Sequence, residues 1–497
     1  MHRGRSAEVE KGIRSIKVKM LPKQLLLLCF AVATARAQNN DDAPGSLSFS
    51  QTLSVLSDFQ PSSFAGSQYT YVTLDGQSTI TTTRSSAGTS SGTASTATGS
   101  GTDSDAQSTR TSTSQSLTVI GGSTPTTNGS ASSTSSSAQP TNTLPCNGYP
   151  EFCNRRYSNV THVAAHNSAF SIRNNAASNQ YFDTETQLND GIRMIQGQTH
   201  YVNDTIYNCH TSCDLLNAGT WQSQLEVITN WVTRHPYDVV TILIGNSDLV
   251  PVGRYVPAIQ NSGLARYLYE PDVIPLRRDD WPTLSEMILS GKRVVLFMDY
   301  MANQQEVPYI LNEFTHMWET PFSPTDQAFP CTVQRPPDLN KTKAQEQFMY
   351  MANHNLNTAV SLSALTGGGG GEPILIPNTA EINQTNGQFD KFGQLERARL
   401  DCTGTFPPSL IPSLLSDPTD LTTEQWNHPP NFLLVDYYNY GDPQPGSVFE
   451  VAARANGVEY TRSCCGAETS AAPVTKRQGS TFALTLASVA LVLAVVI

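Results

Sequence analysis

A long run of serine and threonine constrains this chain more than any other feature of its sequence. Of the 60 residues in 81–140, 34 are Ser or Thr, and none is Phe, Tyr, Trp or Cys. Such a segment cannot bury enough apolar surface to offset the chain entropy that folding removes. We therefore predict a disordered stalk over residues 77–145, with a composition that often carries O-linked sugars. Residues 38–76, which precede the stalk, are polar and have no predicted role.

The N-terminus has the pattern of a secretory signal. Lys17, Lys19 and Lys23 precede the apolar run 25–34, and Ala35-Arg36-Ala37 is a small-x-small cleavage signature. Residues 1–37 are therefore predicted to be a signal peptide. A membrane-spanning signal anchor is the alternative, although the apolar run is short for a bilayer.

The C-terminus has the three parts of a signal for a glycosylphosphatidylinositol (GPI) anchor. Ser470-Ala471-Ala472 is followed by a polar spacer and then by the apolar tail 482–497. We predict an anchor signal over residues 466–497, with the tail removed, and a C-terminal membrane helix as the alternative. The predicted location is the secretory pathway and then the extracellular face of the plasma membrane or the cell wall, with the membrane as partner.

Cysteine usage and charge agree with an extracellular location. The mature chain has eight cysteines, which allow four disulfides in an oxidising compartment, and the close pairs Cys146/Cys153 and Cys209/Cys213 are natural candidates. Glycosylation sequons occur at Asn128, Asn159, Asn203, Asn340 and Asn383. The formal net charge is −11 with only 31 Lys and Arg, which argues against nucleic acid as a partner.

Residues 146–465 have the alternating pattern of an α/β domain. Buried strands are predicted at 160–165, 191–195, 239–244, 293–298, 347–351 and 432–435. Amphipathic helices are predicted at 221–234 and 447–456, the second with a capping box between Ser447 and Glu450. This order and length favour a TIM-type (β/α)8 barrel. The glycine run 367–371 is read as a loop because no Lys-Ser/Thr follows it.

Histidines follow two of the predicted strands. The first strand leads into His166-Asn167-Ser168, and the second is followed by Cys209-His210-Thr211-Ser212-Cys213. In a barrel these positions converge on one mouth. Two facing imidazoles suit phosphodiester cleavage, because one can accept the proton of the attacking hydroxyl while the other protonates the leaving oxygen.

A set of motifs carries a family resemblance. The motifs are Ala165-His166-Asn167-Ser168, Asp190-Gly191-Ile192-Arg193, Cys209-His210-Thr211-Ser212-Cys213, Asn353-His354-Asn355 and Val435-Asp436-Tyr437-Tyr438. With them the chain resembles the fungal secreted phospholipase C (PLC)-like phosphodiesterases and the X-domain barrel of phosphatidylinositol-specific phospholipases C. The resemblance covers residues 146–465. It implies a phosphoric diester hydrolase that acts on a phospholipid or small phosphodiester, in lipid metabolism at the cell surface.

The resemblance also implies roles for individual residues. His166 would be the general base on the attacking hydroxyl and His210 the general acid, with a cyclic phosphate formed first. Substrate contact or structural support falls to Asn167, Arg193, Gln196, Gln198 and Asp436. Structural support is favoured for Arg193, and Asp436 is expected to orient a histidine or hold a cation. Asp299 is a weaker acidic candidate.

The chain lacks both the calcium ligands of the eukaryotic enzymes that it resembles and the phosphate-binding arginine of the bacterial ones. Calcium ligands of the eukaryotic enzymes would fall at Gln196 and Gln198 and near Gly245 and Asn246, none of which is acidic. No metal cofactor is therefore predicted. The Arg that bacterial relatives place at Gln198 is also missing, and Arg173 or Lys341 is a possible substitute.

Three alternatives remain at this point. Cys209, His210 and Cys213 could bind zinc, although a disulfide beside His210 is favoured in a secreted chain. A metal-dependent glycerophosphodiesterase barrel would need an acidic cluster beside His166, where Asn167 stands instead. A catalytically silent barrel that serves as a cell-surface or wall-associated binding protein is the main competing function. The oligomeric state is not predicted.

Overall fold

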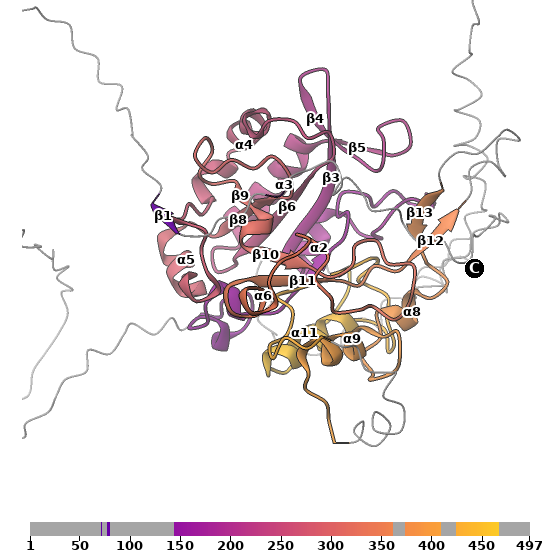
Figure 1. Cartoon of the computed structure of the whole chain (residues 1–497). Helices are drawn as coiled ribbons and strands as arrows, with labels where there is room; N and C mark the ends of the chain where they lie inside the picture. Colours follow the sequence, from indigo (N-terminus) through magenta and orange to yellow (C-terminus); the bar gives the residue numbers. More distant parts are fainter. Residues whose placement is uncertain (1–70, 72–76, 80–143, 361–372, 409–423, 467–497) are drawn as a thin grey trace, which may run out of the picture. The chain divides into compact units, whose positions relative to one another are not determined.

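The computed structural model describes Tyr71, residues 77–79 and residues 144–360, 373–408 and 424–466 (Figure 1). The predicted signal peptide, the glycine run 367–371, the C-terminal tail and nearly all of the predicted stalk lie outside these residues. Of the polar segment 38–76, only Tyr71 is described. The predictions for those segments therefore stay predictions.

Eight parallel strands form the centre of the domain. Their hydrogen-bonded order is β10-β11-β14-β2-β3-β6-β8-β9. The bounds are β2 His162–Ala165, β3 Met194–Val202, β6 Val240–Asn246, β8 Val294–Met298, β9 Leu311–Asn312, β10 Met317–Glu319, β11 Met349–Asn353 and β14 Phe432–Val435. The path ends at β9 and β10, which follow each other in the chain and are joined through the 3-10 helix η7 Glu313–Thr315. This arrangement confirms the predicted TIM-type α/β fold.

Helices and short hairpins fill the connections between the strands (Figure 1). The helices are α2 Thr184–Asp190, α3 Trp221–Arg234, α4 Val256–Asn261, α5 Leu284–Ser290, α6 Lys341–Gln347, α8 Ile382–Thr385, α9 Leu395–Thr403 and α11 Ser447–Asn456. Short 3-10 helices are η2 Pro150–Phe152, η3 Tyr157–Asn159, η4 Val252–Tyr255, η5 Leu264–Tyr267 and η6 Arg278–Asp280. Outside the parallel path lie β1 Ser78–Thr79 with β7 Val273–Ile274, β4 Thr205–Cys209 with β5 Asn217–Thr220, and β12 Asn357–Val360 with β13 Ile374–Pro377.

Both faces of the sheet are buried. Successive side chains along a strand point to opposite faces and therefore belong to two different hydrophobic clusters. One cluster fills the inside of the barrel, and the strand-end residues within it are Ala164, Met194, Leu243, Phe297, Leu311, Met317, Met351 and Leu434. The other lies between the sheet and the helices, where Ile195, Ile242 and Leu433 pack with Ile228 of α3 and Val448 of α11. Burial on both faces explains why the strands read as continuous apolar runs in the sequence.

Seven polar residues and one glycine follow the inner apolar layer toward the carboxyl ends of the strands. Each of these residues stands two positions after one of the eight strand residues named above for the inner cluster. They are His166, Gln196, Gly245, Asp299, Glu313, Glu319, Asn353 and Asp436. Because side chains in a strand alternate between faces, these residues share the inward side at the carboxyl ends of the strands. We call this set the mouth ring, and its acidic half consists of Asp299, Glu313 and Glu319.

The two predicted helices have the expected bounds, but the predicted capping box is wrong. The residue before α11 is Gly446, whose φ of 94° a residue with a side chain rarely adopts, and no side chain caps this helix. The Ser447 hydroxyl instead donates to the carbonyl of Asn386, at 2.8 Å. The helix thus begins against the loop after α8 rather than on a cap of its own.

The surface of the described residues bears on the predicted location. No helix among them is long and apolar enough to span a bilayer. The sequon asparagines Asn159, Asn203, Asn340 and Asn383 are described, and all four are exposed. Their position suits the predicted glycosylation.

Candidate active site

His166 and Asp436 form a buried pair at the mouth. His166 follows β2 and Asp436 follows β14, and the two strands pair in parallel register, so both side chains leave the sheet at the same level. The His166 Nδ1 lies 2.8 Å from Asp436 Oδ1, and the two side chains are 7% and 1% exposed. A carboxylate can only accept, so Nδ1 carries the proton, and Nε2 is the nitrogen available for acid–base chemistry.

Two amide side chains hold this pair in place. Asn179 Nδ2 donates to Asp436 Oδ1 at 2.9 Å, and Gln180 Nε2 donates to the carbonyl of His166 at 2.8 Å. Asn355 Nδ2 lies 3.3 Å from His166 Nδ1, and because both atoms carry hydrogens this is a contact rather than a hydrogen bond. Asn179 and Gln180 belong to the loop before α2, so the orientation of the pair depends on that loop.

His210 is set by a disulfide and a backbone acceptor. Its Nδ1 donates to the carbonyl of Ala177 at 2.8 Å, and its ring stacks on Phe170 with centroids 5.2 Å apart. The Cys209–Cys213 disulfide encloses it, with an S–S distance of 2.04 Å, so these sulfurs are not zinc ligands. Burial, and next the charge of His166, lowers the pKa of His210 to about 4. Both predicted histidines contact the same loop, His166 at Asn179 and His210 at Ala177.

Asn167, Gln196 and Gln198 connect the first two strands of the site. The Asn167 backbone N–H donates to Gln196 Oε1 at 2.8 Å, and the Gln198 backbone N–H donates to Asn167 Oδ1 at 3.3 Å. Gln198 Oε1 accepts from the backbone N–H of Thr211, beside His210, at 3.1 Å. Asn167 Nδ2 is buried and has no hydrogen-bond partner in the described part of the chain. It is therefore a donor that a ligand could use.

Arg193 lies away from the mouth. It precedes β3, at the opposite end of that strand from Gln198. Its guanidinium is 2.7 Å from Asp238, donates to the carbonyls of Leu188 and Ile192, and lies over the ring of Trp231. These contacts agree with structural support and leave no role in phosphate binding.

The other two predicted cations each lie over an aromatic ring. The Arg173 guanidinium lies over the ring of Tyr181 and the Lys341 ammonium over that of Trp426. The cation that does reach the mouth ring is Arg335, whose Nε is 2.9 Å from Glu319 Oε2. Sequence patterns could not find it, because Arg335 lies in a long connection after β10 with no periodic pattern.

In the acidic half of the mouth ring, Glu313 and Glu319 are fully buried and Asp299 is partly buried. Burial raises the pKa of Asp299 to about 7, and burial together with the charge of Glu319 raises the pKa of Glu313 well above its usual range. Asn353 Nδ2 lies 3.3 Å from Glu319 Oε2. Glu319 Oε1 and Asn353 Oδ1 accept no hydrogen bond from the described residues. Glu313, whose raised pKa reflects in part a side-chain hydrogen bond with Glu319, can donate as well as accept. This side of the mouth therefore offers acceptors at Glu319 and Asn353.

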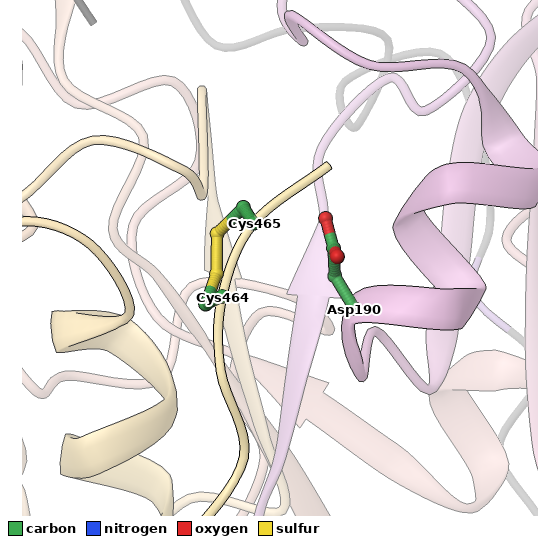
Figure 2. A group of neighbouring side chains, drawn as sticks. All are labelled: Asp190, Cys464 and Cys465. Atoms are coloured by element: carbon green, nitrogen blue, oxygen red, sulfur yellow. A yellow bond between two sulfur atoms is a disulfide. The ribbon is translucent and has the colours of Figure 1, made fainter. Parts of the chain in front are cut away.

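One cluster of potential metal ligands lies outside the mouth ring. Ligand atoms of Asp190, Cys464 and Cys465 approach within 4.8 Å of one another, the only such group of three His, Cys, Asp or Glu side chains among the described residues. Figure 2 shows the two sulfurs bonded to each other in a disulfide facing Asp190. Asp190 accepts from the Tyr438 hydroxyl and the Gly466 backbone N–H. The cluster thus fastens residues 464–466 to the end of α2, and its sulfurs are not thiolates.

Several residues of the site escaped the sequence reasoning. Glu313 and Glu319 could have been found two positions after Leu311 and Met317, but their strands are two and three residues long and give no alternating pattern. Asn179 carries no signal that distinguishes it from an ordinary loop residue, whereas Asn355 stands in the motif Asn353-His354-Asn355 without a predicted role. His354, in a recognised motif, is buried and donates from Nε2 to the carbonyl of Thr385, outside the histidine pair.

Comparisons with known proteins cover the same part of the chain. The family model described as PI-PLC X 1 matches residues 152–448, which include His166, His210 and Asp436. An "Uncharacterized secreted protein" of Arthroderma benhamiae is 55% identical over 334 residues, covering 67% of this chain and 69% of that protein. The "PI-PLC X domain-containing protein 1" of the same fungus is 36% identical over 302 residues, covering 60% and 87%. The phosphatidylinositol-specific phospholipase C of Listeria monocytogenes aligns with a TM-score of 0.38 and 13% identity, over 60% of this chain and 94% of that enzyme.

Proposed function

Because this chain belongs to the PI-PLC X domain family, we propose that it is a phospholipase C-like phosphodiesterase that uses His166 and His210 for acid–base catalysis. The substrate is a phospholipid or a related phosphodiester. The observation that carries the proposal is the His166–Asp436 contact of 2.8 Å at the mouth, with His210 close by.

In each step of the proposed reaction one histidine accepts a proton and the other donates one. His166 Nε2 accepts the proton of a hydroxyl on the headgroup, and that oxygen forms a bond to phosphorus. The bond from phosphorus to the alcohol oxygen breaks, and His210 protonates that oxygen. The resulting cyclic phosphate is then hydrolysed with the two roles reversed and water as the nucleophile. Asp436 stabilises the imidazolium of His166 and fixes its tautomer.

The depressed pKa of His210 fits this scheme only with substrate bound. At neutral pH a group with a pKa of about 4 carries no proton to donate. An anionic phosphodiester between the two rings would favour the charged imidazolium and raise the pKa of His210. In this scheme Asn167 Nδ2, a buried donor without a partner among the described residues, donates to a phosphate oxygen.

The acidic half of the mouth ring indicates the kind of headgroup. Its buried oxygens without partners are acceptors, which hydroxyl groups of a headgroup can satisfy. Arg335 beside Glu319 limits the net negative charge there. A polyhydroxyl headgroup attached to phosphate therefore fits both halves of the mouth: the hydroxyls opposite the acids and the phosphate between the histidines.

The location proposed is the outer cell surface. The relative that is 55% identical is named as a secreted protein, and this supports passage through the secretory pathway. The four disulfides among the described residues suit an oxidising compartment. The GPI anchor rests on the sequence pattern of residues 466–497.

The test is turnover of the secreted full chain on phosphatidylinositol, lysophospholipid and glycerophosphodiester substrates, followed by phosphorus NMR with and without chelator. We expect a cyclic phosphate that persists with chelator. His166→Ala and His210→Ala each remove at least about 10²-fold of the rate, and Asp436→Asn lowers it comparably. Loss of activity with chelator would contradict the metal-free scheme.

A matched control is available in His200. Its Nδ1 is 2.9 Å from Asp248, an imidazole–carboxylate pair of the same kind but outside the mouth ring. His200→Ala leaves turnover unchanged if the mouth pair carries the chemistry. A folded wild-type protein with no turnover on any substrate would instead favour a silent surface barrel that binds ligands.

A further inference from the structure

Tyr71 lies against the barrel although it belongs to the segment that precedes the stalk. Its ring centroid is 4.9 Å from that of Phe314 and 6.0 Å from that of Tyr300, both in edge-on geometry. The hydroxyls of Tyr71 and Tyr300 are 3.4 Å apart. A residue without a predicted role thus has a defined aromatic contact with residues that follow β8 and β9.

Residues 77–79 attach the same segment to the barrel at a second point. Ser78 and Thr79 pair antiparallel with Ile274 and Val273. Gln77 Nε2 donates to the carbonyl of Pro275 at 3.0 Å and to Asp280 Oδ2 at 2.7 Å. Six chain steps from Gln77 allow Tyr71 to reach at most about 22 Å. So short a tether gives Tyr71 an effective concentration of the order of mM at its contact site. At that concentration even a weak contact of Tyr71 with the barrel is formed much of the time.

The surface that Tyr71 contacts is continuous with the acidic half of the mouth ring. Tyr300 follows Asp299 and Phe314 follows Glu313 in the chain. Arg335 Nη1 is 3.3 Å from the Tyr300 hydroxyl, and the same guanidinium binds Glu319. It also lies over the rings of Phe314 and Phe322, at 5.4 and 4.4 Å. Tyr71 therefore adds a ring and a hydroxyl to the network that holds Glu319.

We propose that Tyr71 is an intramolecular competitor of the substrate at the acidic half of the mouth ring. Its hydroxyl and ring occupy the approach to Glu319 and Arg335, where hydroxyls of a headgroup would bind. Substrate must then displace Tyr71 before it fills the mouth, and the segment before the stalk lowers the basal activity. The effect on turnover rests on the function proposed above, whereas the seating of Tyr71 and its effect on ligand binding do not.

The test compares the full secreted chain with Tyr71→Ala and Tyr71→Phe. Hydrogen exchange of the peptide 313–320 reports seating, and calorimetric titration with myo-inositol 1-phosphate reports access to the mouth. We expect Tyr71→Ala to speed exchange several-fold, to tighten the Kd of the probe about 3- to 10-fold and to lower KM by a similar factor at unchanged kcat. Tyr71→Phe keeps the ring and gives an intermediate effect.

Tyr237→Ala is the matched control, because Tyr237 is an exposed tyrosine at the approach to β6 and outside the mouth ring. It changes neither exchange nor binding. Unchanged exchange in Tyr71→Ala overturns the seating. Faster exchange with unchanged or weaker probe binding overturns the competition and leaves Tyr71 as a purely structural contact. If His166→Ala retains full turnover, the proposed catalysis fails while exchange and probe binding still decide the role of Tyr71.

Discussion

At the scale of residues, four described histidines are buried and a fifth, His428, is partly buried, and burial favours the neutral imidazole in all five. Burial lowers the pKa of His162 to about 3 and those of His210, His316, His354 and His428 to about 4. In the unfolded chain these groups titrate near 6.5. Between the two values the unfolded state binds more protons, so the free energy of unfolding falls as the pH falls from 6.5 to 4. Asp299 and Glu313, with raised pKa values, offset part of this loss.

His354→Gln tests this dependence at one site. The glutamine keeps a donor for the Thr385 carbonyl but removes the titration. We expect the stability lost between pH 6.5 and 4 to shrink by up to about 3 kcal/mol relative to wild type. Urea unfolding over that pH range measures it, and the value at pH 7 controls for lost packing on Phe329. An unchanged pH dependence would show that His354 does not contribute.

Residues at strand ends were predictable, and those in long loops were not. His166 and Asp436 follow apolar runs that mark β2 and β14, so a barrel brings them together once its topology is assumed. Asn179 and Arg335 lie in connections where the sequence has no period. Their positions depend on contacts with residues far away in the chain, as between Asn179 and Asp436, which local patterns cannot encode.

At the scale of elements, the disulfides divide into two kinds. The sequence-local pairs Cys146–Cys153 and Cys209–Cys213 are confirmed. Cys331–Cys402, which ties the connection after β10 to α9, has a sequence separation of 71, and no spacing rule could select it. The helices α3 and α11 were predicted with their observed bounds because each has a wide apolar face, whereas β9 and β10 are too short for a pattern.

Replacing each disulfide by two serines separates stability from activity. Loss of Cys331–Cys402 frees a long loop and lowers the free energy of unfolding by about 4 kcal/mol, against about 2 kcal/mol for Cys209–Cys213. Only the second pair encloses His210, so only its loss lowers turnover of the folded protein. Denaturant unfolding and turnover are measured on the same samples. Equal activity in both variants would argue against a positioning role for Cys209–Cys213.

At the scale of the whole molecule, the predicted attachment to the membrane can be tested by deletion. Removing residues 482–497 takes away the apolar tail that an anchor signal requires, so the protein should be released into the medium. A variant in which a Gly/Ser sequence of equal length replaces the tail controls for chain length and should also be released. Immunoblots of medium and membrane fractions measure the result. Continued membrane association of both variants would point to an N-terminal signal anchor.

The wall of the barrel is not equally strong all the way round. Hydrogen-bonded ladders join seven neighbouring pairs of its eight strands, whereas β9 and β10 stand at the two ends of the ladder path and are linked along the chain by η7. Moving β9 away from β10 breaks no backbone hydrogen bonds of a ladder, because none joins these two strands. We therefore expect the barrel to deform more easily here than between any other pair of neighbouring strands. Glu313 lies in that link and Glu319 ends β10. Under the function proposed above, the side of the mouth that would receive the headgroup is thus also the side without a ladder in the wall, and we expect it to adapt to headgroups of different size while the histidine side keeps its geometry.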